Sequence, residues 1–571
     1  MSTPFRTARP ARRAHRVALR SYSLVVPALV LALATPPTRA HARQAPPDAA
    51  RRVDHIFEQW SSLSSPGCAV GVAKDGVTVL ERAYGMADLE HDIPNTPETI
   101  FEGGSLSKQF TAGAVVLLAL EGKLSLDDDV RTYVPEVPDY GHTITLRHLM
   151  THTSGLRDWG SVAGISGWGR ESRTHTHDHV LDIVSRQSAL NFEPGHEYSY
   201  SNTGFNLLAI IVGRVSGMPF AEFSRERIFE SLGMSSTQWR DDYRRIVKGR
   251  SSAYTARDDG TFEINRPIED VHGNGGILST VGDLLIWTRA LADGRLGGPD
   301  FVRMMHEQGR LSDGSRIVYA GGLRVENFAG VPSVTHTGST AGYRAFLGRY
   351  PDQDLAVAML CNVTNVSTGG TGGRIARMFL GDHAVDPEPP AGIELPAAAL
   401  RRLAGLYRDP VTGSTVELRG EGGTLRDGGT TLIPLSETTF ARGAGDDRMV
   451  FDAGTSRRPG FTVESWQYTS QRYDPVEPWT PAASDLEELA GTYHSDDAET
   501  TYVVRVEDGR LTVWQRPDRA RTLSPMYRDG FRTGGNVIRF RRDGSGNVSG
   551  LSLSLGRVYD MRFERVAGGS G

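Results

Sequence analysis

Apolar residues follow two spacings in the first two thirds of the chain. Residues 51–62 carry them at helical intervals, which predicts an amphipathic helix, and the apolar run 110–120 predicts a buried helix. Two β-rich runs on either side of Lys74-Asp75-Gly76 predict a hairpin. From residue 331 the spacing again becomes that of strands, which are expected at 333–339, 343–350 and 355–361. Strands at both ends of a helical middle predict one α/β domain whose sheet joins the two ends.

The helical middle of this domain contains further expected helices and one long loop. The helices are expected at 145–155, 180–186, 205–215 and 283–291. Residues 157–178 are rich in Gly, Ser, Trp and His, a composition that predicts a surface loop. Residues 43–384 are therefore interpreted as one domain.

Beyond a Pro-, Ala- and Glu-rich linker at 385–398, the pattern is almost entirely that of short strands. Leu403-Ala-Gly-Leu-Tyr407 returns as Leu489-Ala-Gly-Thr-Tyr493, and hairpin-like runs follow each copy. Such a repeat predicts two small antiparallel barrels or two halves of one barrel. The two all-β modules are expected at 399–480 and 484–567.

Residues 1–42 have the composition of a secretory signal peptide. Six arginines and no acid precede a short apolar run, residues 23–34, and Ala40-His41-Ala42 is a small-x-small cleavage site. The apolar run is too short for a membrane span, so an exported protein is expected, in the periplasm or outside a bacterial cell. The basic leader leaves both the general and the twin-arginine export route open.

Charge and cysteine content narrow the range of partners. The whole chain has a formal net charge of −5, and removal of the leader with its seven arginines changes this to −12. Such a chain is not suited to bind nucleic-acid phosphates or anionic membranes. No other stretch of the expected mature chain could span a bilayer. The two cysteines, Cys68 and Cys361, are too few for a metal cluster, and are either buried apolar residues or one disulfide.

Ser105 and Lys108 are the first candidates for chemistry. Ser105 lies at the start of the expected buried helix, where free backbone N–H groups and the helix dipole favour a developing negative charge. Lys108, three residues later, lies on the same helix face, so that its amine can reach the serine hydroxyl. Only four of the 63 basic residues are lysine, and a buried Lys, unlike Arg, can lose its proton. A helix start followed by an ordinary surface lysine is the alternative interpretation.

Two further motifs lie far downstream. Tyr200-x-Asn202 is expected in a loop that leads into a helix, and His336-Thr337-Gly338 on a strand near the end of the domain. The glycine would allow a substrate backbone to lie against the strand edge. Taken singly, Tyr200 can be a half-buried aromatic residue, Asn202 a helix cap and His336 a residue of the strand surface.

In this order, S-x-x-K, Y-x-N and H-x-G resemble the active site of the serine penicillin-binding protein and β-lactamase superfamily. The similarity is greatest to the class C β-lactamase group, which includes D-alanyl-D-alanine carboxypeptidases, D-aminopeptidases and esterases. Leu146 to Leu156, Pro194-Gly195 and Gly273 to Thr280 agree with the same group, and the resemblance spans residues from about 50 to 375. It implies an α/β fold with an antiparallel sheet and a helical subdomain, and it implies no cofactor.

The resemblance also implies a role for each matching residue. Ser105 would be the acylated nucleophile, and Lys108 the group that accepts or tunes its proton. Tyr200 would act as base and then as acid toward the leaving group, while His336 would hold the proton network of Tyr200 and a substrate carboxylate or carbonyl. The backbone N–H groups of Ser105 and Ser339 would form the oxyanion hole. Substrate-binding roles are expected for Asn202, Thr337, Gly338 and Ser339.

His336 stands where class C β-lactamases carry Lys, and a neutral imidazole offers less positive charge to a lactam carboxylate. The function hypothesis is therefore hydrolysis of an amide or ester bond through an acyl-enzyme. The expected substrate is a small D-amino-acid-containing peptide, as for a D-aminopeptidase or D,D-carboxypeptidase. A carboxylesterase or weak β-lactamase is the alternative within the same class. A peptidoglycan- or peptide-binding receptor without turnover is the alternative from another class.

Other features of the sequence bear on this interpretation. The C-terminal β-modules resemble the lipocalin-like domains behind some D-aminopeptidases, in which a module loop shapes the substrate cleft. The superfamily fold would set the strands of Cys68 and Cys361 side by side, which would allow a disulfide. His175 to His179 raise zinc as an alternative, although their spacing is one residue short of the metallohydrolase pattern. The chain has no G-x-S-x-G elbow at Ser105, so an α/β-hydrolase does not fit.

Overall fold

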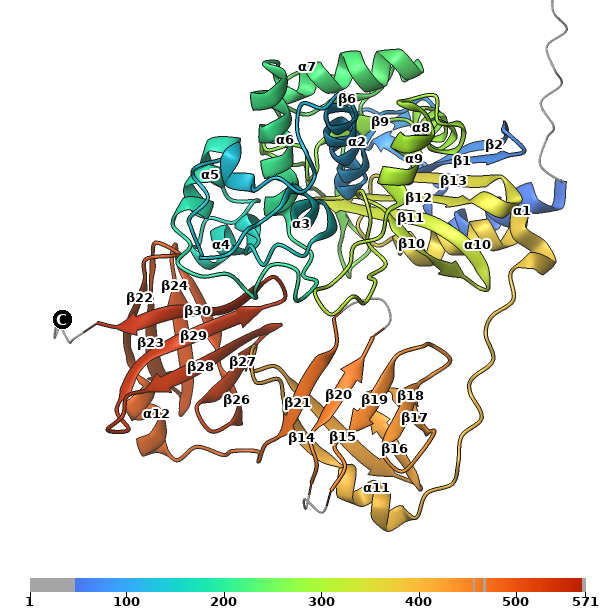
Figure 1. Ribbon diagram of the computed structural model, residues 1–571. Helices are drawn as coiled ribbons and strands as arrows, with labels where there is room; N and C mark the ends of the chain where they lie inside the picture. Colours follow the sequence, from blue (N-terminus) through green and yellow to red (C-terminus); the bar gives the residue numbers. More distant parts are fainter. Residues whose placement is uncertain (1–46, 455–457, 466–468, 567–571) are drawn as a thin grey trace, which may run out of the picture. The chain divides into compact units, whose positions relative to one another are not determined.

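The computed structural model describes residues 47–454, 458–465 and 469–566. The expected signal peptide, residues 1–42, lies outside the described residues. Residues 43–571 cluster as one unit, which contains a mixed domain of helices and strands followed by two β-modules (Figure 1).

A six-stranded antiparallel sheet forms the centre of the mixed domain. Its strands come from both ends of the domain, in the order β10-β11-β12-β13-β1-β2, as the sequence predicted. Cys68 on β1 lies opposite Cys361 on β13, and the two form a disulfide, which decides between the two readings of the cysteines. The strands are β1 (Cys68–Lys74), β2 (Val77–Tyr84), β10 (Arg324–Phe328), β11 (Val331–Thr340), β12 (Tyr343–Tyr350) and β13 (Leu355–Cys361).

Helices pack around this sheet, and the short strands between them form two pairs, β3-β4 and β7-β8, and one three-stranded sheet, β5-β9-β6. The helices are α1 (Pro47–Ile56), α2 (Ser107–Leu120), α3 (Leu146–Thr151), α4 (Trp159–Ile165), α5 (His177–Ser185), α6 (Asn202–Ser216), α7 (Phe220–Ser224), α8 (Val281–Asp293), α9 (Gly298–His306) and α10 (Thr368–Leu380). The short strands are β3 (Met86–Asp88), β4 (Ile93–Pro94), β5 (Phe101–Glu102), β6 (Gln238–Trp239), β7 (Tyr254–Ala256), β8 (Phe262–Ile264) and β9 (Ile277–Ser279). The expected helices are thus present, with ends shifted by a few residues.

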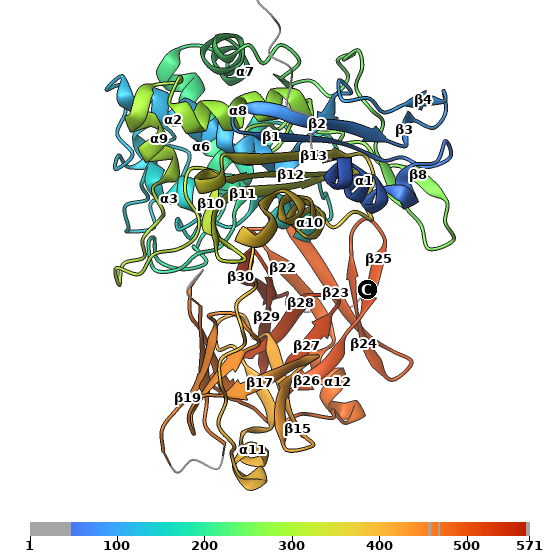
Figure 2. The ribbon, with the colours of Figure 1, turned by 90° about the vertical axis from the view of Figure 1, so that its right-hand side faces the viewer.

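Successive side chains of the central strands pack into two different cores. Val70 of β1 and Val357 of β13 join the core that contains α1 and α10, whereas Ala69 and Ala358 join the core that contains α8. Figure 2 shows α1 and α10 on one side of the sheet and α8 on the other. Burial on both faces explains why β13 is apolar along its whole length rather than alternating.

The expected surface loop at 157–178 is wrong for residues 157–165, which contain α4 and are largely buried, whereas residues 166–176 do form a loop that is exposed at 171–173. Asp158 caps α4 by accepting a hydrogen bond from Ser161 N at 2.9 Å. The Trp159 side chain is fully buried, and its indole N–H donates to Asn206 Oδ1 at 2.8 Å. Tertiary contacts of this kind stabilise a short helix whose glycine content favours a loop.

The C-terminal region forms two separate β-modules rather than two halves of one barrel. In the first module, α11 (Ala397–Leu403) precedes a closed eight-stranded barrel. Its strands are β14 (Gly405–Arg408), β15 (Thr415–Glu421), β16 (Thr424–Asp427), β17 (Thr430–Pro434), β18 (Thr439–Arg442), β19 (Arg448–Phe451), β20 (Phe461–Glu464) and β21 (Gln471–Pro475).

In the second module, α12 (Ala483–Leu489) precedes a nine-stranded antiparallel sheet in the order β25-β24-β23-β22-β30-β29-β28-β27-β26. Its strands are β22 (Gly491–Ser495), β23 (Thr500–Glu507), β24 (Arg510–Gln515), β25 (Arg519–Thr522), β26 (Ser524–Tyr527), β27 (Gly530–Thr533), β28 (Asn536–Arg542), β29 (Val548–Leu555) and β30 (Val558–Arg565). The sequence repeat has a structural counterpart, because Tyr407 donates to Leu403 O and Tyr493 to Leu489 O, each at 2.7 Å.

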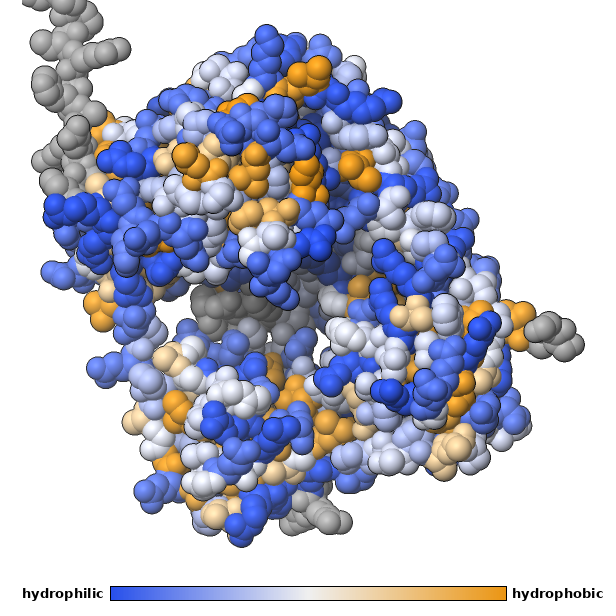
Figure 3. All heavy atoms as spheres, turned by 180° about the vertical axis from the view of Figure 1, so that it is seen from behind, coloured by the Kyte–Doolittle hydropathy of each residue, from blue (hydrophilic) through white to orange (hydrophobic). Residues whose placement is uncertain are grey.

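The surface of this unit is mainly polar on the face seen in Figure 3, where apolar side chains are scattered among hydrophilic ones. Across the described residues, no single helix has both the length and the apolar character needed to cross a membrane. One pair, Asn202–Ser216 with Phe220–Glu230, passes that test only jointly and is bent by 84°.

Candidate active site

Ser105 lies in a 3₁₀ turn, Gly104–Leu106, that leads directly into α2. The turn follows β5, which pairs with β9, and its backbone lies tightly against β11. A Cβ atom on Gly104 would come within 2.7 Å of Ser339 N, and Gly104 has φ +52°. This close approach brings the backbone of Ser105 beside that of Ser339, as an oxyanion hole requires.

Lys108 is fully buried beneath Ser105, one turn along the helix. Its Nζ lies 2.7 Å from Asn274 O, 3.0 Å from Asn202 Oδ1 and 3.3 Å from Ser105 Oγ. Burial, and then the charge of Arg557, hold the pKa of Lys108 well below its ordinary value. An uncharged amine has two N–H groups and one lone pair. When both N–H groups bind the two amide oxygens, the lone pair is left for the Ser105 hydroxyl.

Tyr200 lies between the Lys108 amine and the Arg557 guanidinium at the edge of the site. Lys108 Nζ lies 4.8 Å from its ring centroid, and the Arg557 guanidinium carbon lies 4.7 Å from it. Burial raises the pKa of Tyr200 to about 12, against a lowering influence of the Ser105 hydroxyl. Its own hydroxyl is buried without a well-formed hydrogen bond within the described residues. Tyr200 is therefore a protonated phenol with a free hydrogen-bonding capacity next to the serine.

His336 is neutral and has a defined tautomer. Its Nδ1 lies 2.7 Å from Thr337 O, a carbonyl that can only accept, so Nδ1 carries the proton. Its Nε2 then accepts from the Tyr319 hydroxyl at 2.8 Å. Burial, and then the charge of Lys108, lower the pKa of His336 to about 3. His336 therefore reaches Tyr200 through Tyr319, whose ring centroid lies 6.0 Å from that of Tyr200.

These side chains line one cavity of about 450 Å³. Of the residues proposed from sequence, the cavity brings together Ser105, Tyr200, Asn202, His336, Thr337 and Ser339, with Lys108 directly below. β10 pairs with β11 only as far as Thr335, so β10 does not cover the part of β11 that carries Thr337 and Ser339.

Glycine is required at position 338 for a different reason from the one expected. A Cβ atom there would lie 1.9 Å from Gly103 O, so the glycine accommodates the chain's own backbone rather than a substrate. Gly338 therefore sets the distance between β11 and the turn that carries Ser105.

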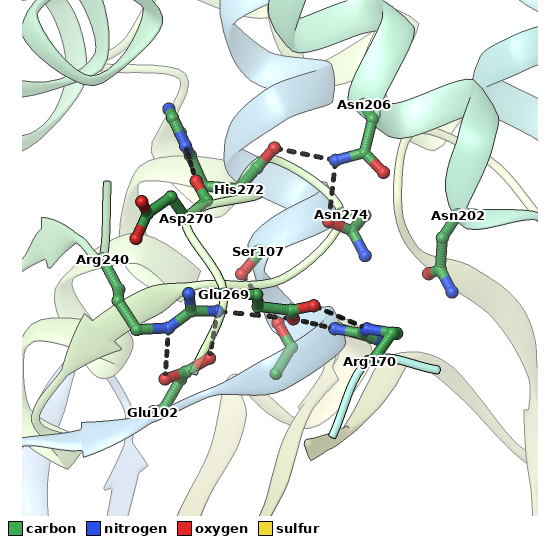
Figure 4. Close-up of polar contacts among 12 residues, drawn as sticks. Glu102, Ser107, Arg170, Asn202, Asn206, Arg240, Glu269, Asp270, His272 and Asn274 are labelled. Carbon is green, nitrogen blue, oxygen red and sulfur yellow. Dashed lines mark hydrogen bonds and ion pairs between the residues drawn. The ribbon is translucent and has the colours of Figure 1, made fainter. Parts of the chain in front are cut away.

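A buried ionic network supports the site from behind (Figure 4). Arg240 donates to both carboxylate oxygens of Glu102, at 3.0 and 3.1 Å, and Glu102 is the residue at the end of β5. Arg170, which lines the cavity, donates to Glu269 at 2.8 Å. Arg240 and Glu269 are 3.6 Å apart, so the two pairs form one network. Paired charges of this kind fix the positions of β5 and Arg170.

Several residues of the site were not found from the sequence. His152, in the left-handed conformation after α3, packs at 4.2 Å between ring centroids against Tyr200, and accepts from Ser201 N. His152 lies within the Leu146–Leu156 stretch that supported the resemblance, so this stretch could have indicated it as a residue of the site. Tyr319 and Arg557 had no such signal, because nothing in their neighbouring sequence distinguishes them.

The histidines at 175–179 point to separate partners. His175 Nε2 lies 3.0 Å from Trp168 O, and His177 Nε2 lies 2.9 Å from His272 O. His179 Nδ1 lies 3.1 Å from Thr176 N at the start of α5. Within the described part of the chain, no group of three or more His, Cys, Asp or Glu residues could hold a metal ion. The hydrogen bonds of these histidines therefore connect loops to one another and stabilise the start of α5.

Comparison with known proteins agrees with this geometry. Residues 52–377, more than half of the chain, match the family model described as Beta-lactamase. The chain therefore belongs to the beta-lactamase family, and it is a serine hydrolase of the β-lactamase-related type. The family and the fold inferred from S-x-x-K, Y-x-N and H-x-G are thus confirmed.

Individual relatives match most of the chain. The D-aminopeptidase of Gluconobacter oxydans (strain 621H) is 27% identical over 541 residues, which cover 88% of this chain and 96% of that protein. Penicillin-binding protein 4* of Bacillus subtilis (strain 168) is 29% identical over 331 residues, covering 55% of this chain and 71% of that protein. The solved octameric penicillin-binding protein homologue from Pyrococcus abyssi has a TM-score of 0.52 and 22% identity, covering 82% of this chain and 99% of that one. This last similarity shows the fold alone.

Proposed function

We propose that this protein is an exported serine hydrolase that cleaves amide bonds in small D-amino-acid-containing peptides through an acyl-enzyme. One observation carries the mechanism. The Lys108 amine lies 3.3 Å from Ser105 Oγ, while two amide oxygens occupy its N–H groups. An uncharged amine at this distance can accept the serine proton as the bond to substrate forms.

The reaction would then proceed in two halves. Ser105 Oγ attacks the substrate carbonyl carbon and its proton passes to Lys108, while the backbone N–H groups of Ser105 and Ser339 bind the oxyanion. The protonated Tyr200 hydroxyl gives a proton to the leaving amine as the C–N bond breaks, and Lys108 restores that proton. Water then attacks the ester at Ser105, and the same groups move its proton back to Ser105 Oγ.

The substrate class rests on the relatives and on His336. Several relatives of comparable length are named D-aminopeptidase, which supports a D-amino-acid-containing substrate. A neutral imidazole at His336, with a pKa of about 3, supplies no positive charge where class C β-lactamases have Lys. This argues for peptides over β-lactams as the preferred substrates.

Export is part of the proposal and rests on two features of the chain. Residues 1–42 have the composition of a signal peptide. The Cys68–Cys361 disulfide supports an oxidising compartment, because such bonds rarely persist in the cytosol. Fractionation of cells that express the full chain, followed by mass measurement of the mature N-terminus, tests both points. A cytosolic chain that retains residue 1 would refute export.

Acyl-adduct mass spectrometry tests the reaction. The wild-type protein should form an adduct with an N-acetyl-D-alanyl ester or amide and hydrolyse N-acetyl-D-alanyl-D-alanine with a higher kcat/KM than nitrocefin or a short-chain ester. Ser105→Ala should form no adduct and lose about 10⁴-fold or more in kcat. Ser524→Ala, a change at an exposed serine of the second module, is the matched control. Turnover that survives Ser105→Ala would refute the serine mechanism.

A further inference from the structure

Arg557 enters the active-site cavity from the far end of the chain. It lies in the turn between β29 and β30 of the second β-module, and it lines the cavity together with Ser105 and Tyr200. Its guanidinium carbon lies 4.7 Å from the Tyr200 ring centroid. The second module therefore contributes a charged side chain to the site of the mixed domain.

The backbone of this turn is firmly held. Arg557 O accepts from Asp158 N at 3.2 Å and from Asn191 Nδ2 at 3.1 Å. Asn191 Oδ1 accepts in turn from Tyr559 N at 2.8 Å. Asp158 also accepts from Asn202 N at 2.7 Å. The turn is thus tied to the start of the helix that carries Asn202, so the backbone of Arg557 is held beside the active site.

The charges around the cavity are unevenly balanced. Arg170 is paired with buried Glu269, and Arg324 with Glu326 at 2.8 Å. For the Arg557 side chain, the described residues provide the Tyr200 ring contact but no ion pair. The described lining of this cavity contains no Asp or Glu. The Arg557 guanidinium therefore lines the cavity next to Ser105 without a carboxylate partner among the described residues.

We propose that Arg557 binds a carboxylate of the substrate adjacent to the scissile bond, and so directs the enzyme to peptides with a free C-terminal carboxylate. The inference rests on the proposed function and names its substrate class. In a dipeptide, the ammonium group and the carboxylate lie on the two residues that flank the scissile amide. The sign of the charge near Ser105 therefore decides whether a free N-terminus or a free C-terminus binds more favourably there. A guanidinium attracts a carboxylate through charge-assisted hydrogen bonds and repels an ammonium group.

Two further acidic side chains line an adjoining cavity. That cavity, of about 360 Å³, is lined by Glu197 and Asp447, and it shares Tyr198, Tyr200 and Arg557 with the first. Arg557 thus lines both cavities. An ammonium group that approached Ser105 would meet the guanidinium charge, which makes the aminopeptidase arrangement the less favourable of the two.

The test compares one matched pair of substrates, N-acetyl-D-alanyl-D-alanine and its C-terminal amide. The wild-type enzyme should show a kcat/KM at least tenfold higher for the free carboxylate. Arg557→Gln should reduce this ratio by about 10–100-fold, the effect of losing one hydrogen-bonded charge. Arg557→Lys, which keeps the charge, should retain an intermediate ratio. A change in the chemistry common to both substrates cancels in the ratio.

Arg562→Gln is the control, since Arg562 lies on β30 of the same module and its side chain is 66% exposed. It should leave the ratio unchanged. A second measurement avoids turnover: calorimetry of N-acetyl-D-alanine against N-acetyl-D-alaninamide on the Ser105→Ala protein, with and without Arg557→Gln. A preference for the carboxylate compound that disappears in Arg557→Gln supports the inference even if the wild-type enzyme hydrolyses no substrate. Absence of hydrolysis would refute only the proposed function. Equal binding of both compounds, or a ratio that Arg557→Gln does not change, would overturn the inference.

Discussion

At the scale of single residues, the site depends on keeping one amine uncharged. Among the described residues, the hydrogen-bond partners of the Lys108 amine are two amide oxygens and the Ser105 hydroxyl, and none of them is a carboxylate. Burial and the nearby Arg557 charge both disfavour protonation. Lysine is rare in this chain, which uses arginine at most basic positions. Lys108, one of the few lysines, is thus the basic residue of the site that can lose its proton.

This environment predicts a pH dependence. Because the uncharged amine is the reactive form, kcat/KM should fall as pH falls through the lowered pKa of Lys108, and this acid limb should lie well below the ordinary lysine value. His336, with a pKa of about 3, should add no further change at neutral pH. Steady-state kinetics across the pH range test the prediction. An acid limb at the ordinary lysine pKa of about 10.4 would contradict it.

Substitution tests the same residue. Lys108→Arg keeps a positive charge at every pH, so it should lower kcat by about 10²–10⁴-fold, the usual contribution of a positioned acid or base. Lys123→Arg changes an exposed lysine just beyond the end of α2 that pairs with Glu121, and it should retain full activity. If Lys108→Arg kept more than a tenth of the activity, Lys108 would not be the proton acceptor.

The sequence could indicate the reacting residues but not all of their neighbours. Ser105, Lys108, Tyr200 and His336 occur in short motifs whose order is informative. Arg557 could not be predicted, because its place depends on how a separate module packs against the mixed domain. Tyr319, which links His336 to Tyr200, occurs in a stretch whose pattern is that of any buried segment.

At the scale of elements, the position of the serine depends on contact between β11 and the turn before α2. Gly103 and Gly104 lie on one side of this contact, and Gly338 and Ser339 on the other. The sequence predicted both elements, α2 from an apolar run long enough for a buried helix and β11 from the strand-like spacing that begins at residue 331. It did not predict that Gly338 faces Gly103, because a glycine in a strand has the same appearance whether a substrate or the chain itself lies against it.

Gly338→Ala should therefore disturb both folding and catalysis. Its Cβ would lie 1.9 Å from Gly103 O, a backbone atom that cannot move without displacing Ser105. We expect a loss of about 1–3 kcal/mol or more in the free energy of unfolding, measured by urea titration, together with a lower kcat. Gly535→Ala is the control, because no atom lies within 4 Å of the added Cβ. Equal unfolding midpoints for both variants would show that the contact is not tight.

At the scale of the whole molecule, the second β-module completes the site. Its contacts with the mixed domain include buried polar ones: Arg157 pairs with Asp497 at 2.6 Å, and Gln515 Nε2 donates to Ile165 O at 2.6 Å. Tyr502 donates to the same carbonyl at 3.0 Å. The repeat in the sequence predicted the modules as β-structures. Their attachment could not be predicted, because it uses ordinary polar residues scattered over distant loops.

Asp497→Ala tests whether this attachment matters for activity. Arg157 and Asp497 have side chains that are only 3% and 13% exposed, so removal of one partner leaves a buried charge and should cost about 3–5 kcal/mol in the free energy of unfolding. Because the module also carries Arg557, the preference for a free carboxylate over its amide should fall with it. Glu564→Ala breaks a more exposed pair with Arg541 in the same module and should cost less than about 1 kcal/mol. Urea titration and the matched peptide pair measure both effects. If Asp497→Ala lowered stability yet left the carboxylate preference unchanged, the module's attachment would serve the fold and not the site.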